Sequence, residues 1–195
     1  MRHRKRTIAQ VVNTYRDQLT NFVYETLNGS MDATDMRRAH IALVRTLGPN
    51  AYAEGLREGG VPAEEMDAAD KAAITEWVTG QLSHINGFAS DTVAARGDDG
   101  KRSQILSRLA LWIESMRVIG SQGLMSAQKN KMGTWKLGAT ERHCRTCNGL
   151  HGKRHRLSWY SSRGLIPRQP GSEVLECKGY KCLCGIYDSE GNQLV

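Results

Sequence analysis

The residues best suited to chemistry are five cysteines between positions 144 and 184. Cys144 and Cys147 form a Cys-x2-Cys pair, and Cys177, Cys182 and Cys184 follow after a basic loop rich in Gly and Pro. Two thiolates at Cys-x2-Cys spacing can bind one Zn²⁺ at roughly 2.3 Å each. A second pair must come from the later cysteines. The sequence therefore predicts zinc held by Cys144, Cys147, Cys177 and either Cys182 or Cys184.

Other uses of these thiols stay open. A redox Cys-x2-Cys belongs to a βαβ pattern, which this sequence does not show, and an odd number of cysteines argues against a framework made only of disulfides. A catalytic zinc needs an open coordination position and a general base. Glu141 and Glu176 are close in sequence, but nothing fixes either as a base. We expect a structural zinc, with His143, His151 and His155 as substitute ligands.

The positive charge of the chain lies in the same region as the cysteines. The net charge is +7, and residues from 129 onward hold 12 Lys/Arg against 5 Asp/Glu, whereas the first 128 residues hold 15 of each. A basic surface beside the predicted zinc site is suited to binding a polyanion such as nucleic acid. A solvated surface or an acidic protein partner is the alternative interpretation.

The first 128 residues predict a helical body with no internal repeat. Apolar residues recur at helical spacing, and Gly48-Pro49-Asn50 is expected to end the second helix. Pro62 is expected to open the long fourth helix. No apolar run approaches the roughly 20 residues that a membrane span needs. The expected helices cover residues 8–27, 32–47, 51–57, 62–93 and 103–127.

The composition changes at Gly133, after which glycines punctuate the chain. Residues 134–137 and 185–187 are predicted to be short strands. Too few apolar residues remain for an independent core. So small a segment usually needs a crosslink, such as a bound metal ion, to stay folded. The predicted fold class is mainly α, with a body of about five helices at residues 1–128. A small zinc-stapled α/β or β-hairpin module follows at residues 129–195.

The cysteine region resembles a known family. The residues that carry the resemblance are the segment from Trp135 to Gly152, which contains Cys-Arg-Thr-Cys and Leu-His-Gly elements, and the later Cys182-Leu-Cys184-Gly185. Together they are similar to the C-terminal signature of phage Mu F-like head morphogenesis proteins. The family also has a Glu-bearing helix before this signature, as residues 103–127 have with Glu114. The family has a histidine where this chain has Gly179, and the resemblance therefore implies that Cys177, two residues earlier, takes over that ligand role.

The resemblance implies a minor head protein of a tailed phage or prophage, made in the host cytoplasm and present in the virion in few copies. Its implied partners are the portal, capsid or scaffold proteins and, through the basic module, packaged DNA. No enzymatic activity is expected. Two alternatives remain: a zinc-containing nucleic-acid enzyme or toxin that uses His143, His151 or His155 as acid or base, and a DNA-binding regulator.

Overall fold

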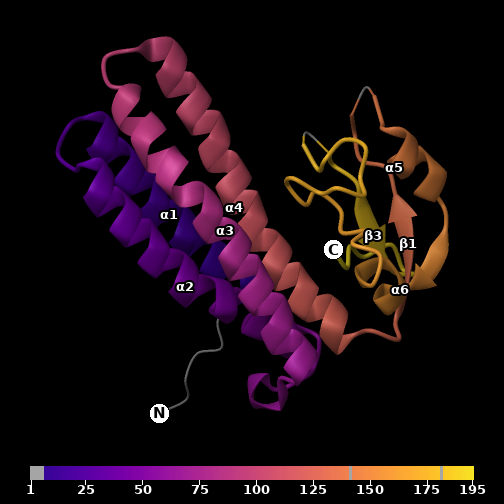
Figure 1. The fold of residues 1–195 in the computed structure, drawn as a ribbon. Coiled ribbons are helices and arrows are strands. Elements are labelled where there is room, and N and C mark those ends of the chain that lie inside the picture. The colour runs from indigo at the N-terminus through magenta and orange to yellow at the C-terminus, as the bar shows by residue number, and fades with distance from the viewer. Residues whose placement is uncertain (1–6, 141, 181) are drawn as a thin grey trace.

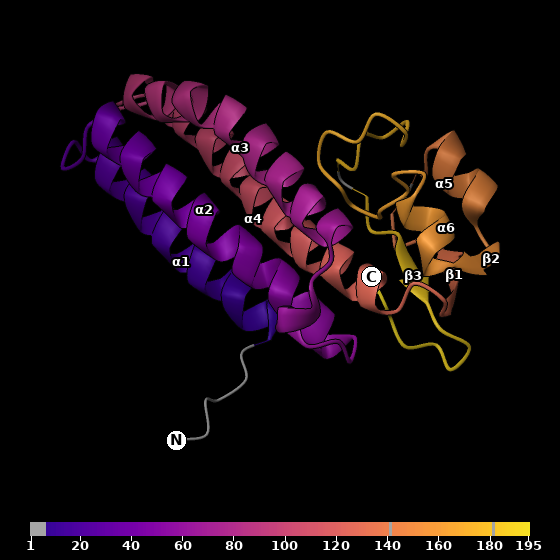
Figure 2. The same ribbon diagram turned by 60° about the horizontal axis from the view of Figure 1, so that its bottom comes forward.

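The computed structural model describes residues 7–140, 142–180 and 182–195. Its body is formed by four long helices, α1 (Ile8–Leu27), α2 (Ala33–Glu58), α3 (Ala68–Ala94) and α4 (Asp99–Ala127). They lie side by side with sequential neighbours antiparallel, and a smaller module follows α4 (Figures 1 and 2). The mainly α fold class with a small C-terminal module is confirmed.

Side-chain caps define where the helices begin. Thr7 caps α1 and exchanges hydrogen bonds with Gln10, so that two backbone donors at the helix start are satisfied together. Asp67 and Asp70 form the same reciprocal arrangement at the start of α3. Asp98 caps α4 by accepting a hydrogen bond from the Lys101 backbone N–H. The caps at Asp67 and Asp98 fix the starts of α3 and α4, which apolar periodicity alone did not locate.

The predicted break at Gly48-Pro49-Asn50 is wrong, because α2 runs through Pro49 without ending. A proline inside a helix removes one backbone hydrogen bond and costs about 3 kcal/mol. Here the buried face of α2 continues beyond Pro49 and packs along α4, and this burial offsets the lost bond. Gly48 is needed for another reason, since a Cβ there would lie 2.3 Å from the Trp77 ring.

Two other predicted starts also need correction. Pro62 caps a short 3-10 turn, η1 (Ala63–Glu65), and α3 begins only at Ala68. Helix α4 begins at Asp99 instead of near Ser103, because Asp98 is the capping residue. The described part of the body thus has four long helices and one 3-10 turn where about five helices were expected.

The core of the body contains a buried histidine among aromatic rings. His40 has no exposed surface, and its Nε2 lies 2.8 Å from the hydroxyl oxygen of Tyr15 in a hydrogen bond. Its ring stands edge-on to Trp112 at a centroid distance of 4.6 Å and to Phe88 at 6.0 Å. His40 is thus a core residue, and one of its ring nitrogens, Nδ1, has no hydrogen-bond partner among the described residues.

Glycines allow α2 and α4 to approach closely. A Cβ at Gly55 would lie 2.0 Å from the carbonyl oxygen of Gly120, and one at Gly123 would lie 2.1 Å from that of Tyr52. Both clashes are with backbone atoms, which cannot rotate away as a flexible side chain can. The two helices therefore pack with their backbones almost in contact.

The module is built on a three-stranded antiparallel sheet. Strand β1 (Met132–Lys136) lies between β2 (Arg154–Arg156) and β3 (Gly185–Tyr187), with Trp135 opposite Ile186. The prediction of β3 is confirmed, and β1 begins two residues earlier than predicted. Two short helices complete the module: α5 (Arg145–Leu150) and α6 (Leu157–Ser161).

The module's core is shared with the last turns of α4. Trp135, Leu157, Tyr160 and Ile186 have no exposed surface and form the centre of this core, as does Met125 of α4. Helix α4 also contacts α6 directly. The module is thus packed onto the bundle through a common apolar core. None of the described helices has the length and apolar character required to cross a membrane.

Candidate metal centre

All five cysteine thiols converge at one end of the module. The sulfurs of Cys144, Cys147 and Cys177 lie within 4.8 Å of one another, and so do those of Cys147, Cys182 and Cys184. Cys147 belongs to both groups, and its Sγ is 4.0 Å from that of Cys182. All five are free thiols. The structure thus brings together every cysteine that the sequence predicted as a ligand.

Helix α5 positions the first pair of cysteines. Cys144 is the capping residue of α5, and its sulfur accepts a hydrogen bond from the Cys147 backbone N–H at 3.4 Å. This turn brings both thiols to the same end of the helix, where backbone N–H groups favour negative charge. The two thiols of the Cys-x2-Cys pair therefore lie close together, as their spacing predicted.

Glu176 brings the third thiol to the same place. Its Oε2 accepts a hydrogen bond from the Arg145 backbone N–H at 2.6 Å, and its own backbone N–H donates to Thr146 Oγ1 at 3.2 Å. Glu176 therefore satisfies a free donor at the start of α5 and fixes its neighbour Cys177 beside Cys144. Its role here is to position the chain, a role that sequence spacing did not predict.

A close backbone approach positions Cys182 and Cys184. A Cβ at Gly138 would lie 2.0 Å from the carbonyl oxygen of Leu183, so the loop after β1 packs directly on the Cys-x-Cys segment. Cys184 is buried and immediately precedes β3, whose pairing with β1 fixes it in register. The second group of thiols is thus held by the sheet, as the first is held by α5.

The thiols perturb one another's protonation. Hydrogen bonds from Cys147 and Cys182 lower the pKa of Cys184 to about 3, and its thiolate is the form that binds a metal. Hydrogen bonds with Cys182 and Cys184 raise the pKa of Cys147. Burial raises the pKa of Cys177 to about 11. The cluster therefore favours a mixture of thiolates and thiols until a cation compensates the negative charge.

The donor set fits a tetrahedral metal ion. Four sulfurs at about 2.3 Å from Zn²⁺ would stand roughly 3.8 Å apart. The Cys147 and Cys182 sulfurs are 4.0 Å apart, and the three sulfurs of each group lie within 4.8 Å of one another. Sulfur-only ligation suits Zn²⁺, and it also suits iron in iron–sulfur clusters. Cys144, Cys147 and Cys177 with one of Cys182 or Cys184 would complete the four positions.

The three nearby histidines lie outside the two groups of thiols identified in the described structure. His143 Nδ1 lies 3.0 Å from Thr140 Oγ1 in a hydrogen bond. His151 Nδ1 accepts a longer hydrogen bond, 3.4 Å, from the Leu137 backbone N–H. His155 stacks on a tryptophan ring in a different part of the module. Glu141, the other acid considered as a base, lies outside the described residues.

Glu114, singled out on the last body helix, ties the module to the bundle. Its carboxylate accepts a hydrogen bond from Arg168 Nη2 at 3.1 Å and forms an ion pair with Arg168 Nε at 2.9 Å. It accepts a further hydrogen bond from Arg117. Arg117 also donates to the carbonyl oxygen of Pro167 in the module. The Glu114 side chain is only 20% exposed, so these contacts are partly shielded from water. Spacing along the sequence gave no signal for this long-range pair.

Comparisons with protein-family models, with curated proteins and with solved structures return no match for this chain.

Proposed function

We propose that this chain is a non-enzymatic assembly protein, a minor head protein of a tailed phage, in which Zn²⁺ bound by cysteine thiolates holds a basic module on a helical bundle. In this role it resides in the virion in few copies and docks on portal, capsid or scaffold proteins. Zinc supplies a tetrahedral crosslink, and the residues that hold it are Cys144, Cys147, Cys177 and one of Cys182 or Cys184.

The observation that carries the proposal is the convergence of thiols from separate segments of a module with a small core. Cys144 and Cys147 come from α5, Cys177 from a loop fixed by Glu176, and Cys184 from the start of β3. A metal that joins these segments replaces the apolar burial that so short a segment lacks. Four sulfur ligands fill a tetrahedral shell, which is typical of structural and not catalytic zinc.

Two further observations support the assembly role. The segment from Trp135 to Gly185 resembles the phage Mu F-like signature in its cysteine spacing and in the preceding Glu-bearing helix. In addition, the module is fastened to α4 by Glu114, Arg117 and Arg168, so that it has a defined orientation on the bundle. A fixed orientation suits a protein that joins two larger components.

Metal content and chelation test the first half of the proposal. The purified chain should carry about one Zn²⁺ per molecule, measured by inductively coupled plasma mass spectrometry. Chelation should abolish the near-ultraviolet circular dichroism of the buried Trp135–Tyr160 pair, whereas most of the far-ultraviolet helical signal remains. A chain that carries no metal and keeps both signals in chelator contradicts a structural zinc.

Co-assembly tests the second half. The genes next to this one should encode portal, terminase or capsid proteins, and the chain should co-migrate with the neighbouring portal protein when the two are co-expressed. Mass spectrometry of assembled heads should find a few copies per particle. The assembly role is contradicted if the zinc-loaded chain migrates separately from the portal and is absent from heads.

A further inference from the structure

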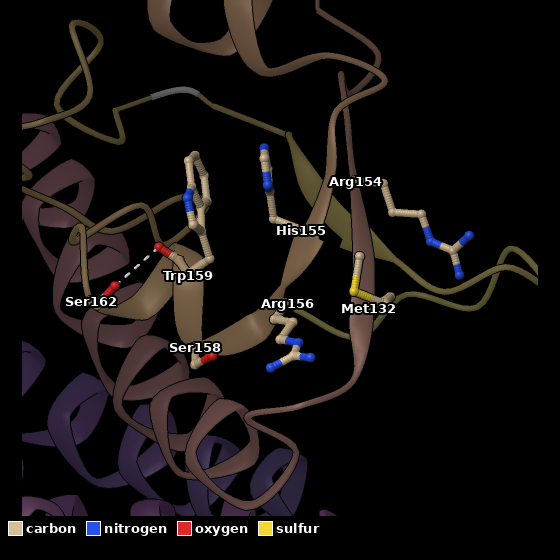
Figure 3. A pocket seen from close by; sticks show the side chains of 7 residues that line it. All are labelled: Met132, Arg154, His155, Arg156, Ser158, Trp159 and Ser162. Atoms are coloured by element: carbon tan, nitrogen blue, oxygen red, sulfur yellow. Dashed lines mark hydrogen bonds between the residues drawn. The ribbon is translucent and has the colours of Figure 1, made fainter.

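A second candidate site lies where β2 meets α6, on a different part of the module from the thiols. It is an open pocket of about 750 Å³ lined chiefly by Met132, Arg154, His155, Arg156 and Trp159. In Figure 3 the rings of Trp159 and His155 stand side by side, and Arg156 and Met132 lie below them in this view. The lining thus combines aromatic rings with two arginines.

The aromatic part of this pocket is a stack of three planar groups. The His155 and Trp159 rings are nearly parallel, with an interplanar angle of 14° and centroids 3.7 Å apart. The Arg163 guanidinium lies over the Trp159 ring, 4.4 Å from its centroid. His155 and Trp159 are both only half-buried, so the stack meets solvent in the pocket. Planar groups arranged in this way attract a further flat π system.

The arginines take the opposite side of the strand. Successive residues of a strand point to opposite faces, so Arg154 and Arg156 share the outer face of the sheet while His155 faces α6. Strand β2 is at the edge of the sheet, and both arginines are exposed. A polymer that crosses this edge can therefore touch the aromatic stack and the arginines together.

The surrounding charge is of one sign. Residues 142–172 contain seven Lys/Arg and no Asp or Glu. Within this stretch, the exposed Lys153 and Arg163 extend the positive charge of the pocket. Such a surface attracts an anionic chain, and phosphates are the natural anions where aromatic rings are also offered.

We infer that this pocket binds single-stranded nucleic acid. An unpaired base extends the stack of Arg163, Trp159 and His155, and adjacent phosphates contact Arg154 and Arg156. Every base has a π face, so the binding is tolerant of sequence. A base inside a duplex has both faces covered by its neighbours, so paired strands cannot enter the stack. The inference rests on the metal-stapled module of the proposed function but not on its assembly partners.

Fluorescence anisotropy with labelled 12-nucleotide oligothymidylate, oligouridylate and a 12-base-pair duplex tests the inference on the zinc-loaded full chain. Both single strands should bind more tightly than the duplex, and the tighter of the two shows whether DNA or RNA is preferred. His155→Ala should weaken single-strand binding by fivefold or more, because stacking is worth about 1–3 kcal/mol per base. His155→Phe keeps a flat ring and should retain binding.

A double variant tests the phosphate contacts. Arg154→Ala with Arg156→Ala should reduce the slope of log affinity against log salt by about 1.4, since each contact to a single strand contributes about 0.7. Arg37→Ala with Arg45→Ala removes the same charge from exposed positions on α2 and is the matched control. Zinc content and circular dichroism of every variant separate a lost fold from a lost contact.

Several results overturn the inference. These are equal binding of duplex and single strands, unchanged affinity in folded His155→Ala, and a salt slope that both double variants reduce equally. Competition by polyglutamate as effective as that by oligothymidylate shows an acidic protein surface as the occupant instead. If the purified chain is folded by circular dichroism but carries no metal, the proposed structural zinc fails, and the same titration on this folded chain decides separately whether the pocket binds.

Discussion

At the scale of single residues, Cys147 is central to the thiol cluster because both groups of sulfurs include it. Cys147→Ser should therefore lose the bound zinc and the near-ultraviolet signal of the module. Cys182→Ser and Cys184→Ser each keep Cys147 together with Cys144, Cys177 and one later thiol, so each should retain about one Zn²⁺.

Replacing zinc with cobalt compares metal binding by the three Cys→Ser variants, because thiolate-to-metal charge-transfer absorption reports the number of sulfur ligands. The two variants at Cys182 and Cys184 are controls for Cys147→Ser, because they remove the same atom elsewhere in the cluster. Equal zinc loss in all three variants would contradict the shared position of Cys147.

His40 should make the stability of the bundle depend on pH. Burial lowers the pKa of His40 to about 3, whereas an unfolded chain has a histidine pKa of about 6.5. Between these values the unfolded chain takes up a proton that the folded chain excludes. The contribution is therefore fully present above pH 6.5 and lost as pH falls, by about 3 kcal/mol at pH 4.

Urea unfolding at a series of pH values measures this dependence. In His40→Gln the fall in the free energy of unfolding between pH 7 and pH 4 should be shallower than in the original chain. His84→Gln, at an exposed position on α3, is the control and should leave the slope unchanged. Parallel pH profiles for the original chain and His40→Gln would show that His40 does not carry the effect.

At the scale of elements, the contact between α2 and α4 depends on glycine. Gly123→Ala should destabilise the bundle by about 1–3 kcal/mol, because its Cβ would meet the Tyr52 carbonyl oxygen and force the helices apart. Gly80→Ala on α3 is the matched control. Its Cβ meets nothing within 4 Å, so it should stabilise the chain by about 1 kcal/mol through helix propensity.

Thermal unfolding followed by circular dichroism compares the two glycine variants directly. The midpoint of Gly123→Ala should fall and that of Gly80→Ala should rise. A pair of similar shifts would indicate that α2 and α4 are less closely packed than described.

The same scale shows which elements the sequence can predict. Helix α1 follows from its apolar period and its Asn28-Gly29 end, and β3 from its short apolar run. The continuity of α2 through Pro49 could not be predicted, because it depends on tertiary burial against α4. Helices α5 and α6 are too short to show a period, and β2 reads Arg-His-Arg, which has no strand pattern.

The candidate metal site also has features that the sequence predicts and features that it does not. The five thiols could be found from residue type and local spacing, because Cys-x2-Cys fixes its own geometry. The bracing by Glu176 and the Glu114–Arg168 pair could not, since their partners are distant in sequence. The spacing of His155 and Trp159, four residues apart within a stretch free of acids, was an available signal for the second pocket.

At the scale of the whole molecule, Glu114 determines how firmly the module is held. Arg168 adopts a φ of 64°, which is unfavourable for a non-glycine residue, and its hydrogen bond and ion pair with Glu114 stabilise that conformation. Glu114→Gln should loosen the module from α4 while leaving the thiols and their metal unaffected. Hydrogen exchange should show faster exchange in residues 165–169 and across β1.

Asp91→Asn is the matched control for Glu114→Gln. It breaks the ion pair between Asp91 and Arg108 on the surface of the bundle. The Asp91 side chain is 58% exposed and that of Arg108 is 39% exposed. An exposed pair contributes about 0–1 kcal/mol, so exchange in the module should not change. Equal exchange in the two variants would show that Glu114 does not fasten the module.

Helix α4 has one further consequence, which concerns the order in which the chain is made. Its last turns contribute Val118 and Met125 to the core of the module, yet the rest of that core lies later in the sequence. A ribosome therefore releases the bundle with an apolar strip of α4 uncovered. If the module is held by zinc as proposed, the strip is covered only when the cysteines have emerged and bound the metal. Metal-starved cells should accordingly accumulate newly made chains bound to chaperones. In these chains the helical bundle is folded and the apolar strip of α4 is still exposed.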